Sequence, residues 1–155
     1  LPDGSTQAVD LFWVRSPRGP DAVTAALPKL EHDLEQVISG RIAPSELLKR
    51  DTLSPSDARA RRVPTEVSFN HKASAKHTVI EVLTRDRPGL LFTIAQALHR
   101  LGVSIAVAKI TTEGERASDV FYVTEFDGTK LESEGRTRVV HERLLEVLDL
   151  SRAVA

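Results

Sequence analysis

The sequence of 155 residues contains no cysteine and no methionine, and aromatic residues make up only 5% of it. Without cysteine, disulfides, thiolate metal sites and a cysteine nucleophile are excluded. Few aromatic side chains are available for stacking on nucleic-acid bases. No apolar run approaches the ~20 residues that a membrane-spanning helix needs, and no basic segment leads into an apolar one as in a signal peptide. These absences predict a cytoplasmic protein.

The sequence also lacks an excess of charge of either sign, with 21 Lys and Arg against 22 Asp and Glu. This balance gives no electrostatic reason to expect nucleic acid or an acidic membrane surface as a partner. Apolar residues at 41% and charged residues at 28% are typical of a globular protein. The missing initiator methionine, together with an early Pro-Asp-Gly turn, predicts a segment of a longer polypeptide.

Two short segments of the chain repeat each other. The stretch "AVDLFWV" at Ala8–Val14 and the stretch "ASDVFYV" at Ala117–Val123 share Asp, an aliphatic residue, Phe, an aromatic residue and Val in the same order. Each is followed by a polar turn and an amphipathic helical pattern, but only the later copy has a strand, a helix and a strand before it. We therefore expect the back half of a first repeat (strand plus helix) at 1–40, a short helix and linker at 41–64, a complete module at 65–150 and a tail at 151–155.

The helix expected in the first part has apolar residues at spacings of three and four, namely Val23, Leu27, Leu30, Leu34 and Val37. Asp21 is a candidate N-cap and Gly40 a candidate C-terminal residue for this helix. Pro28 lies inside the pattern and predicts either a kink or a late start. A second, short helix is expected at Pro44–Asp51, followed by a connector rich in Ser, Pro and Arg.

The complete module contains six expected elements, in the order strand, strand, helix, strand, strand, helix. Their expected bounds are Val67–Asn70, Thr78–Thr84, Pro88 or Gly89 to Leu101, Ser104–Thr111, Val120–Phe126 and Arg136–Leu150. This order favours an α+β ferredoxin-like sandwich, a four-stranded antiparallel sheet with two helices on one face. Because the strands carry apolar residues on both faces, the uncovered face is expected to meet another module or a second copy of the chain.

The junction between the second strand and its helix carries three charges and a Pro-Gly pair. Asp86 is a candidate N-cap, Pro88 fits the first helical turn, and Gly89 leaves the backbone open. The free N–H groups of such a helix start suit a carboxylate, and Asp86 suits an ammonium, so a free amino acid matches both. The same residues also make a cap and turn without any ligand, and Arg85 and Arg87 are expected to be solvated.

Three motifs resemble the ACT domain, a small ligand-sensing regulatory module: "DRPGLL" at 86–91, "AKITT" at 108–112 and "DVFYV" at 119–123. The resemblance extends from Val67 to about Leu148. It is greatest to the ACT repeats that end the family of bifunctional enzymes which attach UMP to the nitrogen regulator PII and remove it again.

This resemblance implies a region that senses an amino acid, glutamine in that family, and controls distant catalytic domains. It implies PII as a partner of the full-length enzyme and Mg²⁺ as a cofactor of its catalytic part, with no cofactor in this segment. By position, the amino-acid site maps to Asp86, Arg87, Pro88, Gly89, Leu90, Leu91, Ile105, Ala106 and Val107. The alternative is a ligand-free ACT module that serves dimerisation or docking between domains.

Two other classes of function have little support in the sequence. The five histidines show no metal-ligand spacing, and neither the Gly-Ser and paired-Asp pattern of nucleotidyltransferases nor a nucleophile elbow is present, so the segment is not expected to be an enzyme. The same sandwich architecture also hosts RNA recognition. Here, however, Asp119 and Glu125 on the relevant strand would repel phosphate.

Overall fold

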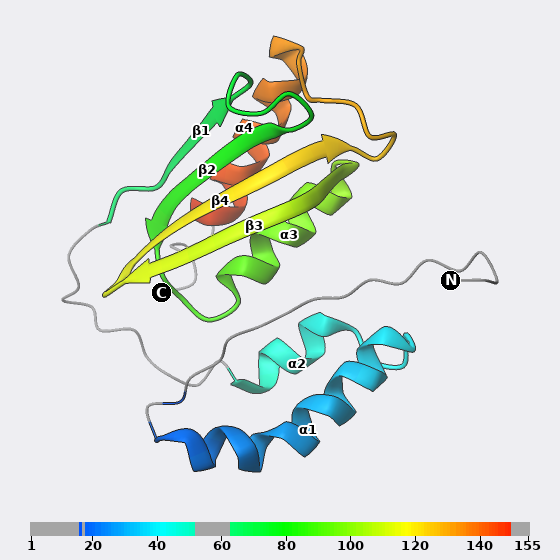
Figure 1. Ribbon diagram of the computed structural model, residues 1–155, viewed down its shortest axis with the longest axis vertical. Helices are drawn as coiled ribbons and strands as arrows, with labels where there is room; N and C mark the ends of the chain where they lie inside the picture. Colours follow the sequence, from blue (N-terminus) through cyan, green and yellow to red (C-terminus); the bar gives the residue numbers. More distant parts are fainter. Residues whose placement is uncertain (1–15, 17, 52–62, 150–155) are drawn as a thin grey trace. The chain divides into compact units, whose positions relative to one another are not determined.

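The computed structural model describes residues 16, 18–51 and 63–149. The chain divides into two compact units, Leu1–Asp51 and Thr52–Ala155, which are coloured blue to cyan and green to red in Figure 1. The strand that the sequence predicts at Ala8–Val14 lies outside the described residues.

The first unit contains two helices, α1 (Pro20–Ile38) and α2 (Pro44–Asp51). The N-cap of α1 is Gly19, and Asp21 lies in the first turn, so the prediction of Asp21 as the cap was wrong. Pro20 takes the first helical position, where its missing N–H has no cost, and this fixes the cap one residue before it. The helix runs through Pro28 without a late start. It ends at Ile38 with Ser39 as the C-cap, and Gly40 follows with φ 72°, in the C-terminal position predicted for it. The Arg41 N–H donates to Gln36 O at 2.9 Å.

No residue of α1 is buried. Its apolar stripe includes Leu27, Leu30 and Leu34, whose exposed fractions are 42%, 47% and 49%. A helix of this kind normally buries such a stripe against a neighbouring layer. The described structure therefore shows an amphipathic helix whose apolar side has little cover.

The second unit is a four-stranded antiparallel sheet with the strand order β1-β2-β4-β3. Its elements are β1 (Glu66–Asn70), β2 (Thr78–Arg85), α3 (Leu90–Arg100), β3 (Val103–Glu113), β4 (Arg116–Glu125) and α4 (Glu134–Asp149). Both helices lie on the same face of the sheet (Figure 1). This arrangement confirms the predicted ferredoxin-like sandwich, with element bounds that lie within four residues of those expected.

The core lies between that face and the two helices. Burial along β4 alternates, because every second side chain of a strand points to the same face. The helices contribute apolar residues at spacings of three and four, so that one stripe of each faces the sheet. The main buried contributors are Ile80, Val82, Ile94, Leu98, Phe121, Val123, Val140, Leu144 and Leu148.

The other face of the sheet carries a mixture of apolar and charged side chains. Leu83, Val120 and Tyr122 lie there and are half-buried, and Glu81 lies among them. The ammonium of Lys109 sits 5.4 Å from the centre of the Tyr122 ring, a favourable cation–π arrangement. That a partner covers this face stays a prediction.

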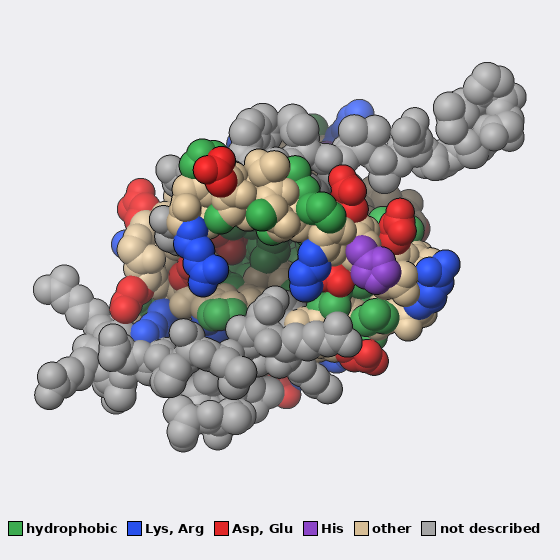
Figure 2. Space-filling view, turned by 90° about the horizontal axis from the view of Figure 1, so that it is seen from below, with side chains coloured by type: hydrophobic (Ala, Val, Ile, Leu, Met, Phe, Trp, Pro, Cys, Tyr) green, Lys and Arg blue, Asp and Glu red, His purple; other side chains and the backbone are tan. Residues whose placement is uncertain are grey.

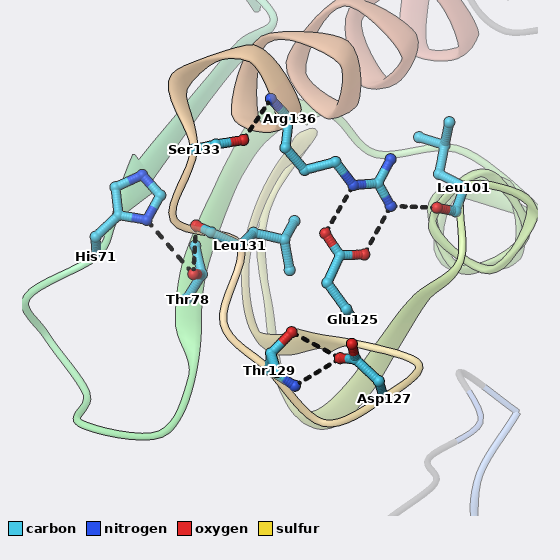
Figure 3. A network of polar contacts seen from close by, with 9 residues as sticks. All are labelled: His71, Thr78, Leu101, Glu125, Asp127, Thr129, Leu131, Ser133 and Arg136. Carbon is cyan, nitrogen blue, oxygen red and sulfur yellow. Dashed lines mark hydrogen bonds and ion pairs between the residues drawn. The ribbon is translucent and has the colours of Figure 1, made fainter.

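Arg136 near the start of α4 joins three elements of the second unit (Figure 3). Its Nε donates to Glu125 Oε1 at 2.7 Å and its Nη2 to Glu125 Oε2 at 2.8 Å. Nη2 also donates to the carbonyl of Leu101, which follows α3. The Glu125 carboxylate raises the pKa of Arg136. This two-point ion pair fixes the start of α4 against β4 and the end of α3.

We expect Arg136→Ala to lower the free energy of unfolding by roughly 1.5–3 kcal/mol, because it removes charge-assisted hydrogen bonds from a half-buried junction. Arg143→Ala on the same helix is the control, since the Arg143–Glu146 pair is exposed and should be worth at most ~0.5 kcal/mol. Urea unfolding of both variants measures the difference. Equal losses would show that Arg136 has no special role.

Candidate functional site

The segment between β2 and α3 forms a tight turn before the helix begins. The N–H of Leu90 donates to the carbonyl of Arg87 at 3.1 Å. Gly89 has φ 75° and ψ 8°, and Pro88 precedes it. Pro followed by a residue of positive φ is the signature of a type II turn, which therefore spans Arg87–Leu90. The helix starts only at Leu90, later than the sequence analysis expected.

This turn changes the roles predicted for two residues. The N-cap of α3 is Gly89, and no side chain caps the helix, so the prediction of Asp86 as the cap was wrong. Pro88 lies in the turn and not in the first helical turn. Among the described residues, none accepts a hydrogen bond from the backbone N–H of Leu91 or Phe92. The helix start thus keeps donors that can meet an anionic group.

The backbone of Asp86 ties the turn to the β3–β4 hairpin, because its N–H donates to Glu115 O at 2.8 Å. The side chain of Asp86 is exposed and takes no part in this bond. The Asp86 carboxylate is therefore accessible to a cationic group from outside the chain.

The two arginines beside Asp86 are less solvated than expected. Arg85 lies 3.7 Å from Glu115 in an ion pair. Arg87 is half-buried, and its Nη2 is buried without a hydrogen-bond partner among the described residues. Burial lowers the pKa of Arg87, and the charge of Asp149 partly offsets this. The expectation of two solvated side chains was therefore wrong for Arg87.

Asp119 on β4 is a buried carboxyl group that is not among the predicted site residues. It is 2% exposed, and its Oδ1 accepts a hydrogen bond from Thr111 N–H at 3.4 Å. Burial raises the pKa of Asp119, the Thr111 N–H opposes this, and the charge of Asp86 adds to it. The internal repeat could have pointed to it, because Asp10 holds the same place in the first copy.

The predicted residues of β3 lie far from the turn within one chain. Ile105 faces Val123, and Val123 faces Thr78 at the start of β2. The turn instead follows Arg85 at the other end of β2. The structure thus brings together the residues from Asp86 to Leu91 and leaves Ile105, Ala106 and Val107 at the opposite end of the sheet. A site made of both sets needs a second sheet.

A cleft of about 630 Å³ lies near the hairpin end of the sheet. The residues that line the cleft include Leu83, Arg116 and three glutamates, Glu66, Glu113 and Glu115. None of the nine predicted site residues lines this cleft. The lining residue Glu115 connects the cleft to the turn, because its carbonyl accepts a hydrogen bond from Asp86 N–H.

The charges on the face seen in Figure 2 are mixed, with Lys and Arg side chains interspersed with Asp and Glu among the described residues. No continuous basic stripe of the kind that tracks a phosphate backbone is visible there. None of the described helices is both long and apolar enough to cross a membrane.

The ACT domain family model matches residues 78–134, which run from β2 through the turn, α3, β3 and β4 to the first residue of α4. This match agrees with the sandwich and with the position of the turn between its first matched strand and helix. Residues 78–134 belong to the ACT domain family.

Nearly the whole chain is also similar to part of larger proteins named bifunctional uridylyltransferase/uridylyl-removing enzyme. The protein of that name from Azospirillum brasilense is 42% identical over 144 residues, which are 91% of this chain and 15% of the relative. The proteins from Ruegeria pomeroyi and Novosphingobium aromaticivorans are 37% and 39% identical over 90% and 92% of this chain, and 15% and 16% of their own length. The chain therefore spans about 15% of the length of these relatives.

We expect Gly89→Ala to cost ~1–2 kcal/mol of stability, because a side chain at φ 75° is strained. Gly135→Ala in α4 is the control, since a Cβ there meets nothing within 4 Å. An alanine at this helical position should be neutral or stabilising by up to ~1 kcal/mol. Thermal unfolding of both variants tests the turn geometry, and a neutral Gly89→Ala would contradict it.

Asp119→Asn should stabilise the protein at neutral pH. Because the pKa of Asp119 is raised on folding, the folded state binds the proton more tightly than the unfolded chain. The stabilisation from the protonated Asp119 carboxyl is fully present below its pKa in the unfolded chain, about 3.9. It is lost as the pH rises through the pKa of Asp119 in the folded state. The gain from Asp119→Asn should therefore shrink as the pH falls toward about 4.

The control for this experiment is Asp127→Asn, for which the opposite sign is expected. Hydrogen bonds from the hydroxyl and N–H of Thr129 lower the pKa of the exposed Asp127 carboxyl. Its contribution to stability is present above the unfolded pKa, so Asp127→Asn should lose stability at neutral pH. Urea unfolding across the pH range measures both variants, and a loss on Asp119→Asn would refute the argument.

Proposed function

We propose that this chain is a regulatory region that binds a free amino acid, glutamine, and controls the uridylyltransferase and uridylyl-removing activities of a larger enzyme. The observation that carries the proposal is the turn before α3, which follows an exposed carboxylate at Asp86 and leads into free helix N–H groups at Leu91 and Phe92. An α-amino acid offers the complementary ammonium and carboxylate.

The similarity of nearly the whole chain to part of the named bifunctional enzymes supports the regulatory role. In this proposal the PII protein is the target of the full-length enzyme, Mg²⁺ serves its catalytic part, and the whole protein works in the cytoplasm. The catalytic chemistry belongs to domains other than this one.

We also place α1 in a first ACT repeat. A shift of 110 positions aligns its Leu30 and Leu34 with Val140 and Leu144 of α4. The α4 residues are fully buried against the sheet, whereas those of α1 are about half exposed. A second sheet beneath α1 would complete the repeat and cover the stripe.

Thermal unfolding of this chain against a panel of free amino acids tests the proposal. Ligand that binds only the folded state stabilises it by mass action, by about 2.7 kcal/mol at a concentration of 100 times Kd. We expect glutamine to raise the unfolding temperature and Asp86→Ala to abolish the rise while leaving the unliganded stability nearly unchanged, because Asp86 caps no helix.

Glu142→Ala is the matched control, because it also removes one exposed carboxylate from the same unit and should leave the glutamine response intact. If no amino acid raises the unfolding temperature of the wild type, the sensing role fails for this chain. The alternative, a ligand-free module for dimerisation or docking, would then hold.

A further inference from the structure

Asp119 is a charged side chain on the face of the sheet that otherwise carries apolar ones. Along β4 it alternates in step with Ala117 and Phe121, so it points to the face that α3 and α4 cover. It is 2% exposed. Its neighbours across the two adjoining strands are Val82 on β2 and Ile110 on β3, and neither can pair with a carboxylate. A carboxylate buried in this way is costly unless it has a partner.

The described residues give the Asp119 carboxylate little compensation for its burial. Its one hydrogen bond comes from the N–H of Thr111 to Oδ1 at 3.4 Å, which is longer than the usual range of about 2.7–3.2 Å. None of the ion pairs formed by the described residues includes Asp119. The charge that acts on it is the carboxylate of Asp86 on the turn before α3, which repels it. Two carboxylates therefore interact here without a cation from the described residues to separate them.

We propose that Asp119 is a second ligand-binding carboxylate of the amino-acid site, and that Asp119 and Asp86 hold the ammonium group of the ligand between them. The ammonium belongs to the amino acid of the proposed function, on which this assignment rests. A primary ammonium has three N–H donors and one positive charge. It can therefore donate to both carboxylates and replace their repulsion by two charge-assisted hydrogen bonds.

An ammonium group matches this pair of carboxylates better than a metal ion does. Among the residues that the structure describes, no group of three or more His, Asp and Glu side chains is placed to hold a metal. Calcium takes about six to eight oxygen ligands, which two carboxylates cannot supply alone. The ligand class is therefore a small molecule with a free amine.

The two carboxylates differ in how strongly they can hold the amine. Asp86 is exposed, so water and salt screen its charge. Asp119 is buried, and a hydrogen bond to a buried charge is stronger because the surroundings are less polarisable than water. We therefore expect binding to depend on Asp119 at least as much as on Asp86.

Asp119→Asn tests this assignment, because it removes the charge and keeps the shape of the side chain. In thermal unfolding of the full 155-residue chain at increasing glutamine concentration, the apparent Kd of Asp119→Asn should be roughly tenfold higher than that of the wild type. Asp127→Asn is the matched control, because it makes the same change at an exposed position in the turn after β4 and should keep the wild-type affinity. Circular dichroism checks that each variant folds.

A pH titration of the Asp119 carboxyl group, followed by NMR, tests the pair in the folded protein without any ligand. Asp86→Asn should lower the pKa of Asp119, because it removes the like charge that raises it. Val82, Ile110 and the first turn of α3, which surround this position, carry no titratable side chain. Saturating glutamine should also lower the pKa of Asp119 in the wild type, because a neighbouring ammonium favours the ionised form.

The outcomes separate the role of Asp119 from the sensing role of the whole region. A wild type that responds to no amino acid overturns both. A glutamine response that is unchanged in Asp119→Asn, or a pKa of Asp119 that is unchanged in Asp86→Asn, overturns the two-carboxylate site and leaves the sensing role in place. N-acetylglutamine keeps the carboxylate of the ligand but lacks the ammonium, so a response equal to that of glutamine would likewise overturn the site.

Discussion

The helices α3 and α4 reach both edges of the sheet but cover β3 only at its start, and this constraint shapes the rest of the second unit. The buried stripes of α3 and α4 lie against β2, β4 and the adjoining part of β1, where Ile80, Phe121 and Val140 are fully buried. β3 takes part in that core only at its start, through Val103 and Ile105. The remaining length of β3 is held by its backbone pairing with β4 alone, and its side chains meet water on both faces.

The sequence allowed the sandwich to be predicted because its apolar periodicity changes clearly between strands and helices. The starts of the helices were harder to predict from the sequence than the sandwich itself. For both α1 and α3 the sequence predicts an aspartate as the N-cap, and in both a glycine, Gly19 or Gly89, holds that position. The dipeptides Gly-Pro and Pro-Gly fix backbone angles directly, and this local constraint outweighs the preference of a carboxylate for a helix end.

The site could be predicted only in part, for a tertiary reason. The residues from Asp86 to Leu91 are contiguous in sequence, so the prediction that they lie together does not depend on the tertiary fold. Whether Ile105 to Val107 lie near it depends on the length and direction of β3, and an 11-residue antiparallel strand carries them away. The burial of Asp119 depends on the layers packed around it, and a single sequence gives no measure of that. A buried carboxylate with a raised pKa is a candidate functional group because its charge is costly to keep.

The backbone hydrogen bond between Asp86 and Glu115 joins the turn before α3 to the tip of the β3–β4 hairpin. A shift of the turn cannot occur without moving the hairpin tip or breaking this bond. The hairpin is long, since its two strands have 11 and 10 residues and are paired along their length except at the bulge at Ala106. In the proposed function, an amino acid that displaced the turn would therefore also displace the hairpin tip along the edge of the sheet.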